Sequence, residues 1–85
     1  MTDRFDPAKD AINRAKHDIS LGRAFDMEIV RFIVDERYDY GEVRYRAWGF
    51  IDGRGYFLAF TLRDGAVWPI SLRRAHDKEM RKNAG

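Results

Sequence analysis

The sequence contains no cysteine, which excludes disulfides, thiolate zinc sites and a cysteine nucleophile. It has only two histidines, His17 and His76, and they stand too far apart to form a recognisable metal pair. No GxSxG, P-loop or pre-helical GxGxxG pattern occurs, so nucleotide-cofactor chemistry has no support. We therefore expect a protein without a metal or cofactor, held together by packing alone.

Long apolar runs are also missing, and the N-terminus is polar and charged rather than signal-like. A length of 85 residues is too short for two cores, so a single domain over 1–85 is expected. Aromatic residues make up 14% of the chain, which is enough for a small packed core. We expect a soluble, cytoplasmic protein with no membrane association.

The charges are unevenly divided along the chain. Residues 1–42 carry 7 Lys/Arg and 10 Asp/Glu, whereas residues 43–85 carry 9 and 4. The second half therefore has an excess of five positive charges, which suits phosphate or an acidic protein partner. An ordinary surface with an uneven distribution along the sequence is the alternative.

Two helices are predicted before residue 28. Asp6 can cap the first helix and Pro7 suits its first position. Ser20 can cap a second, short helix. The apolar spacing predicts that the first helix buries one small-residue face, formed by Ala8, Ala11, Ile12 and Ala15.

Most of the remaining chain is predicted to form strands. β-Branched and aromatic residues predict a strand over 29–34, and a β-meander is predicted over 43–51, 56–62 and 67–72. Asp52-Gly53 and Asp64-Gly65 predict type I′ hairpin turns. The predicted fold is therefore α+β, with N-terminal helices packed on a small antiparallel sheet and a C-terminal helix from Ala75 to about Lys82.

Two two-residue turns would place Trp48 opposite Phe57 and Phe57 opposite Leu72, on one core face. Tyr45, Tyr56, Ser71 and Arg73 would then share the other face, although one bulge would exchange the faces of a strand. Pro69 cannot donate a ladder hydrogen bond, so the last strand is expected at an edge or bulged. The C-terminal helix is strongly polar and is expected to be loosely docked, frayed or ordered by a partner.

Several polar residues can carry chemistry. His17 can act as a general acid or base, or simply complement the end of the first helix. Glu42 and Arg44 point to one face of a strand, so they can act jointly or form a salt bridge. Ser71 and Arg73 share a face near Arg74, and arginine beside tyrosine rings suits single-stranded RNA. The alternative for both arginines is a solvated helix start.

Four segments, in order, resemble the BrnT toxins. Phe5-Asp6-Pro7-Ala8-Lys9 resembles their WDxxK opening, and Asn13-Arg14-Ala15-Lys16-His17 with Ser20-Leu21 resembles NxxKHG followed by SF. Glu42-Val43-Arg44-Tyr45 with Gly49 and Asp52-Gly53-Arg54 resembles ExRFxxxG…DGR, and residues 70–75 resemble ISARRA. The chain departs from this pattern with Phe5 for Trp, Leu72 for Ala, and Asp18 for the glycine after His17. Asp18 must then tolerate a left-handed conformation or the turn differs.

The resemblance implies a RelE/ParE-like fold and an endoribonuclease toxin of a type II toxin–antitoxin system. It implies metal-independent RNA cleavage that inhibits translation and growth, and a BrnA-type ribbon–helix–helix antitoxin that binds operator DNA as a complex. The expected catalytic residues are Arg73, Arg44, His17 and Glu42, and the expected RNA contacts are Lys16, Tyr56, Ser71 and Arg74. The alternative is a non-catalytic module that binds the antitoxin and acts as a DNA co-repressor.

Overall fold

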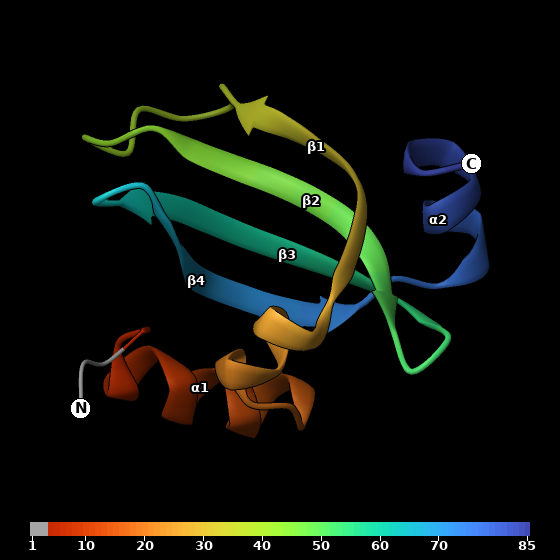
Figure 1. Ribbon diagram of the computed structural model, residues 1–85, viewed down its shortest axis with the longest axis horizontal. Helices are drawn as coiled ribbons and strands as arrows, with labels where there is room; N and C mark the ends of the chain where they lie inside the picture. Colours follow the sequence, from red (N-terminus) through yellow and green to blue (C-terminus); the bar gives the residue numbers. More distant parts are fainter. Residues whose placement is uncertain (1–3) are drawn as a thin grey trace.

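The computed structural model describes residues 4–85, so the first three residues of the predicted domain lie outside it. The chain forms helix α1 (Pro7–His17), the 3-10 helix η1 (Leu21–Asp26), four strands and helix α2. The strands are β1 (Glu28–Asp35), β2 (Arg44–Ile51), β3 (Arg54–Arg63) and β4 (Ala66–Arg74), and α2 spans Asp77–Asn83. The sheet is antiparallel in the order β1-β2-β3-β4 (Figure 1). The predicted α+β class is confirmed.

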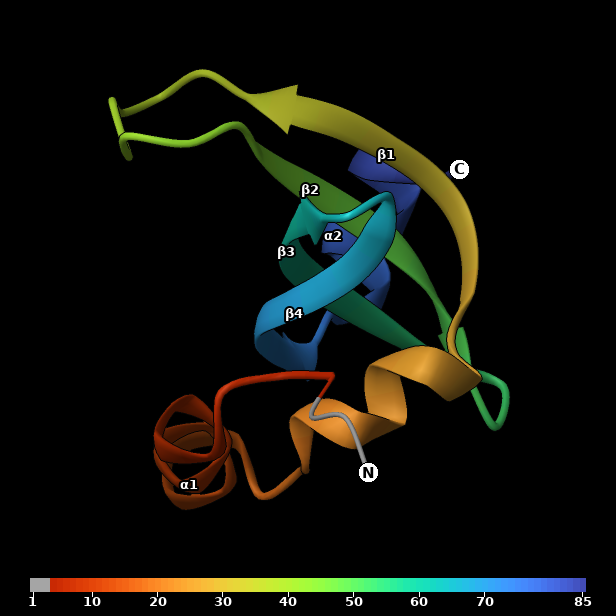
Figure 2. The ribbon, with the colours of Figure 1, turned by 60° about the vertical axis from the view of Figure 1, so that its left-hand side comes forward.

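Helix η1 and helix α2 cover opposite faces of the sheet, while α1 lies along the β4 edge (Figure 2). We name the two faces after these helices. The η1 face holds the larger core, which is formed by Leu21, Ala24, Ala47, Ile51, Leu58, Phe60 and Leu72. The α2 face holds a second core, which is formed by Trp48, Phe57, Ala75 and Met80.

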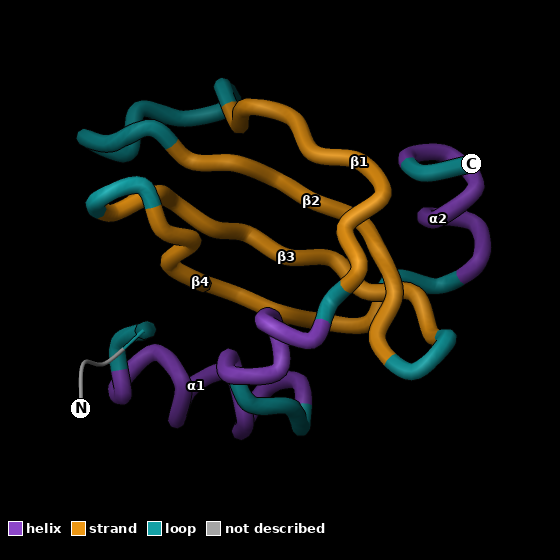
Figure 3. The backbone as a smooth tube through the Cα atoms, in the orientation of Figure 1, coloured by secondary structure: helices purple, strands orange, loops and turns teal. Residues whose placement is uncertain are grey.

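Both predicted hairpin turns are confirmed. Asp52 and Gly53 have φ values of 51° and 77°, and Asp64 and Gly65 have 52° and 77°, as a type I′ turn requires. The first turn pairs Trp48 with Phe57, as expected. Figure 3 shows both turns joining neighbouring strands at opposite ends of the sheet.

The predicted partner of Phe57 is wrong by one residue. A bulge lies between the pairs Ala59–Ser71 and Phe60–Pro69, so Ile70 is the extra residue in β4. Phe57 therefore pairs with Arg73, and Leu72 turns to the η1 face beside Leu58. The bulge sits next to Pro69, which cannot donate a ladder hydrogen bond, on the edge strand where such a residue is tolerated.

The predicted buried face of α1 is also wrong. Ala8, Ala11, Ile12 and Ala15 are all exposed, and the one buried residue of this helix is Asn13. The helix packs against a strand edge, where unpaired backbone groups favour a polar side chain over an apolar stripe.

Helix α2 is docked rather than frayed. Met80 is buried against Trp48, Phe57 and Ala75, and the Trp48 indole donates to Glu79 at 3.2 Å. Gly55 makes room for this contact, because a Cβ there would lie 2.6 Å from Met80 Cγ. Arg73 and Arg31 add hydrogen bonds to Glu79 and to the Asn83 carbonyl, so this polar helix is held against the sheet.

Candidate functional site

A groove lies between helix α1 and strand β4. Its volume is about 180 Å³, and its lining residues are Lys9, Ile12, Asn13, Lys16, His17, Ile70 and Ser71. Two of these side chains are lysines and one is a histidine, and among residues 4–85 no carboxylate lines the groove. We call it the basic groove. Its chemistry suits an anion such as a phosphate group.

Asn13 fixes the position of this groove. Its amide accepts from the Leu72 N–H at 3.0 Å and donates to the Leu72 and Ile19 carbonyls, both at 2.9 Å. The side chain thus pairs with β4 as a neighbouring strand would, which satisfies a buried backbone edge. From sequence, Asn13 had only a place in a motif, because its role becomes visible only through its burial against β4.

Lys9 and Lys16 flank Asn13 because residues three and four apart share a helix face. His17 is the last residue of α1, and Asp18 follows with φ 57° and ψ 34° while its N–H donates to the Arg14 carbonyl. Aspartate therefore adopts the left-handed cap that a glycine would otherwise supply. The exposed His17 ring lines the basic groove together with Ser71.

Arg73 lies two residues beyond Ser71 on the same sheet face, as predicted. Its guanidinium sits 4.4 Å from the Phe57 ring centroid and donates to both Glu79 carboxylate oxygens, at 2.8 and 3.0 Å. These hydrogen bonds hold the pKa of Glu79 below its usual range, against the opposing effect of burial. Arg73 is thus a fixed cation with a protein counter-ion from α2.

Arg44 and Glu42 form a separate pair at the far end of the sheet. Arg44 Nε lies 3.3 Å from Glu42 Oε2, and its guanidinium lies 4.2 Å from the Tyr40 ring centroid. Arg44 pairs with Thr61 on β3 whereas Arg73 pairs with Phe57, four residues away. That offset is about 13 Å along the strand. The structure therefore does not gather the four predicted catalytic residues in one pocket.

The predicted RNA contacts also divide between the two faces. Lys16 and Ser71 line the basic groove. Arg74 lies over Tyr56 at 5.5 Å, and the register puts both on the η1 face. The expectation that Tyr45 and Tyr56 share a face with Arg73 is wrong, because the bulge at Ile70 reverses the last part of β4.

A polar cluster around Asp35 was not anticipated. The buried Asp35 carboxylate accepts from Arg37 Nε and Nη2, both at 2.9 Å, and from the Tyr40 hydroxyl at 3.0 Å. The hydrogen bonds from Arg37 hold the pKa of Asp35 well below its usual range. This cluster orders the loop that carries Glu42 towards Arg44. The polar composition of residues 35–41 gave no sign of it.

Within residues 4–85, no group of three or more His, Asp or Glu side chains is placed to hold a metal ion. None of the helices described is long and apolar enough to cross a bilayer.

Comparison with known proteins adds an identification at the family level. Residues 5–79 match the family model described as ribonuclease toxin, BrnT, of type II toxin–antitoxin system. Searches of curated proteins and of solved structures gave no match. The family match covers all four motif segments and every element except the last part of α2. The chain therefore belongs to the family of BrnT ribonuclease toxins of type II toxin–antitoxin systems.

Proposed function

We propose that this protein is a RelE-like endoribonuclease that cleaves RNA without a metal ion and thereby inhibits translation and growth. The 2′-hydroxyl attacks the adjacent phosphate, and the bond from phosphorus to the 5′-oxygen breaks. The products are a 2′,3′-cyclic phosphate and a 5′-hydroxyl. This reaction needs a base for the 2′-hydroxyl, positive charge beside the phosphorane and a proton for the leaving oxygen.

The observation that carries the proposal is the grouping of Lys16, His17 and Ser71 in one groove, with Arg73 next along the same face of β4. His17 moves protons, since an imidazole ring has one nitrogen that accepts a proton and another that donates one. Arg73 supplies permanent charge in a forked geometry that matches phosphate oxygens. Lys16 and Ser71 position the same phosphate.

Glu42 is the rival proton carrier and Arg44 the second phosphate contact. Their pair lies on the exposed end of β2, where the Arg44 guanidinium over Tyr40 forms a stackable basic surface. Arg74 and Tyr56 form a similar pair on the other face. We assign these pairs to nucleotides that flank the cleaved bond.

We further propose that the neutralising partner is a BrnA-type ribbon–helix–helix antitoxin, and that the complex binds operator DNA through the antitoxin. The family assignment supports an antitoxin partner. If the chain were only an antitoxin-binding and co-repressor module, the folded protein would leave RNA intact at every concentration.

The test is RNA cleavage by the purified protein and by Arg73→Ala, with Arg54→Ala as the matched control. Arg54 is an exposed arginine at the start of β3, in the hairpin and away from the basic groove. We expect Arg73→Ala to lose cleavage and growth arrest by about a hundredfold or more, as when a charge that stabilises a transition state is removed. Full toxicity in a folded Arg73→Ala protein would refute this role.

A further inference from the structure

The two edges of the sheet differ in how far the rest of the chain covers them. The β4 edge is covered by α1 and η1, and Asn13 pairs directly with its backbone. Strand β1 forms the other edge, and its packing is almost entirely with β2. Within residues 4–85, no other segment donates a backbone hydrogen bond to the outer side of β1. An eight-residue strand is thus left with alternate N–H and C=O groups free.

The side chains of β1 are also unusually exposed for their chemistry. Phe32 is 61% exposed, and Ile29, Val30 and Val34 are exposed as well. Such an edge is normally protected by charged side chains, proline, a bulge or a cover, because it otherwise pairs with other chains. Strand β1 has a bulge between Ile29 and Arg31, but the run Phe32-Ile33-Val34 beyond it carries no charge and no proline.

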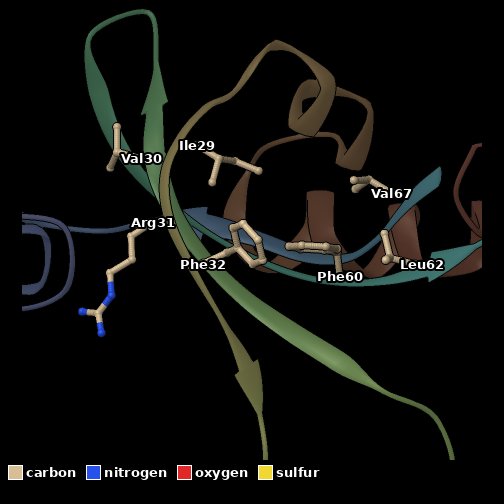
Figure 4. Close-up of a pocket in the computed structure, with 7 residues that line it drawn as sticks. All are labelled: Ile29, Val30, Arg31, Phe32, Phe60, Leu62 and Val67. Carbon is tan, nitrogen blue, oxygen red and sulfur yellow. The ribbon is translucent and has the colours of Figure 1, made fainter. Parts of the chain in front are cut away.

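An apolar groove adjoins this edge on the η1 face. Its volume is about 600 Å³, and Ile29, Phe32, Phe60, Leu62 and Val67 line it with Val30 and Arg31. Figure 4 shows the first five of these side chains gathered on one side of the sheet, while Arg31 points to the other side. The groove is therefore an apolar hollow directly beside free backbone groups.

We propose that an extended segment of the antitoxin adds to the sheet as a fifth strand beside β1 and places apolar side chains in this groove. The inference rests on the assignment of the chain to the type II toxins, which act with a protein antitoxin. Free backbone groups would supply affinity, and the apolar hollow would select alternate side chains. Arg31 lies on the opposite face, where its guanidinium donates to the Asn83 carbonyl at 2.9 Å, and its positive charge favours an acidic residue of the segment beside it.

A second copy of this chain fits the same edge less well. Antiparallel pairing of two β1 strands over their full length sets Glu28 of each copy against Asp35 of the other. Like charges directly opposite one another destabilise a strand pair.

The experiment combines Phe32→Lys with the matched variant Tyr38→Lys. Both side chains are strongly exposed aromatics, at 61% and 69%, but Tyr38 lies in the loop outside the groove. Binding is measured by titrating each variant with purified antitoxin. Amide exchange of residues 29–34 is followed in the free protein and in the complex. RNA cleavage by each variant is measured in parallel. We expect Phe32→Lys to weaken binding by about tenfold or more and Tyr38→Lys to leave it unchanged. We also expect the antitoxin to protect the amides of β1.

Unchanged binding by folded Phe32→Lys together with unprotected β1 amides would overturn the inference, even if the protein cleaves RNA. A concentration-dependent dimer of the free protein that Phe32→Lys abolishes would also overturn it, in favour of self-pairing. Protected β1 amides in a protein that leaves RNA intact would support the inference and refute the proposed nuclease. The two claims therefore fail separately.

Discussion

The Arg73 guanidinium and the Glu79 carboxylate meet at two points, with Nη1–Oε1 at 2.8 Å and Nη2–Oε2 at 3.0 Å. This pair ties the last strand to helix α2 beside the basic groove. It also means that a phosphate approaching Arg73 competes with a carboxylate that is already in place. The geometry makes Glu79 a modulator of the residue to which we assign phosphate charge.

The first prediction concerns Glu79→Gln. The amide keeps an acceptor for the Trp48 indole but removes the negative charge beside Arg73. We expect single-stranded RNA to bind severalfold more tightly and with a steeper salt dependence, because one more cation is free to displace counter-ions. Binding at several salt concentrations measures both effects, and weaker binding would mean that Glu79 instead positions Arg73 for RNA.

The second prediction concerns Asn13→Ala, which removes two hydrogen bonds to the backbone of β4 and one to the Ile19 carbonyl. The Leu72 N–H and carbonyl would lose their partner in a buried place, at a cost of about 2–4 kcal/mol in the free energy of unfolding. Urea unfolding measures the change. Asn83→Ala is the control, since that amide makes one hydrogen bond within α2. Equal losses in the two variants would contradict the edge-pairing role of Asn13.

The third prediction is a pH dependence that arises from Asp35. Its pKa is lowered in the folded state by the hydrogen bonds from Arg37, so the carboxylate stabilises the fold above its ordinary pKa of about 4. That contribution is lost progressively as the pH falls below 4. We therefore expect Asp35→Asn to be less stable than the parent protein at pH 7, and the difference to shrink towards pH 3.

Urea unfolding of both proteins at pH 7, 5, 4 and 3 would follow this difference directly. A constant difference across the series would show that the amide change disrupts packing rather than a charged cluster. Glu36→Gln provides a control, because this neighbouring carboxylate is exposed.

Sequence patterns that span only a few neighbouring residues were enough to predict the helices, strands and turns of the fold. Asp6, Ser20 and the two Asp-Gly pairs act through their own backbone neighbourhood, so caps and turns were predicted where they occur. The sheet faces to which the β4 side chains point were not predicted correctly. They depend on the bulge at Ile70, which arises where Pro69 pairs with Phe60 of β3. The exposed stripe of α1 shows the same limit, since spacing predicts an apolar face but not whether anything covers it.

The candidate site, too, was predictable where it depends on positions within one strand, and not where it depends on how separate elements pack. Parity placed Ser71 and Arg73 on one face because both follow the bulge. The basic groove required knowledge that α1 lies along the edge of β4, and Asn13 is the residue that decides this. The contact between Arg73 and Glu79 joins a strand to a helix whose docking the composition did not predict.

The central claim is metal-independent cleavage of RNA by groups around the basic groove. It is tested most directly by incubating a short RNA with the purified protein and a chelator, and by analysing the new 3′ ends. We predict 2′,3′-cyclic phosphate ends in undiminished yield, and loss of these products in folded His17→Ala and Arg73→Ala but not in Arg54→Ala. Cleavage that stops when the metal is removed, or that persists in both His17→Ala and Arg73→Ala, would contradict the account.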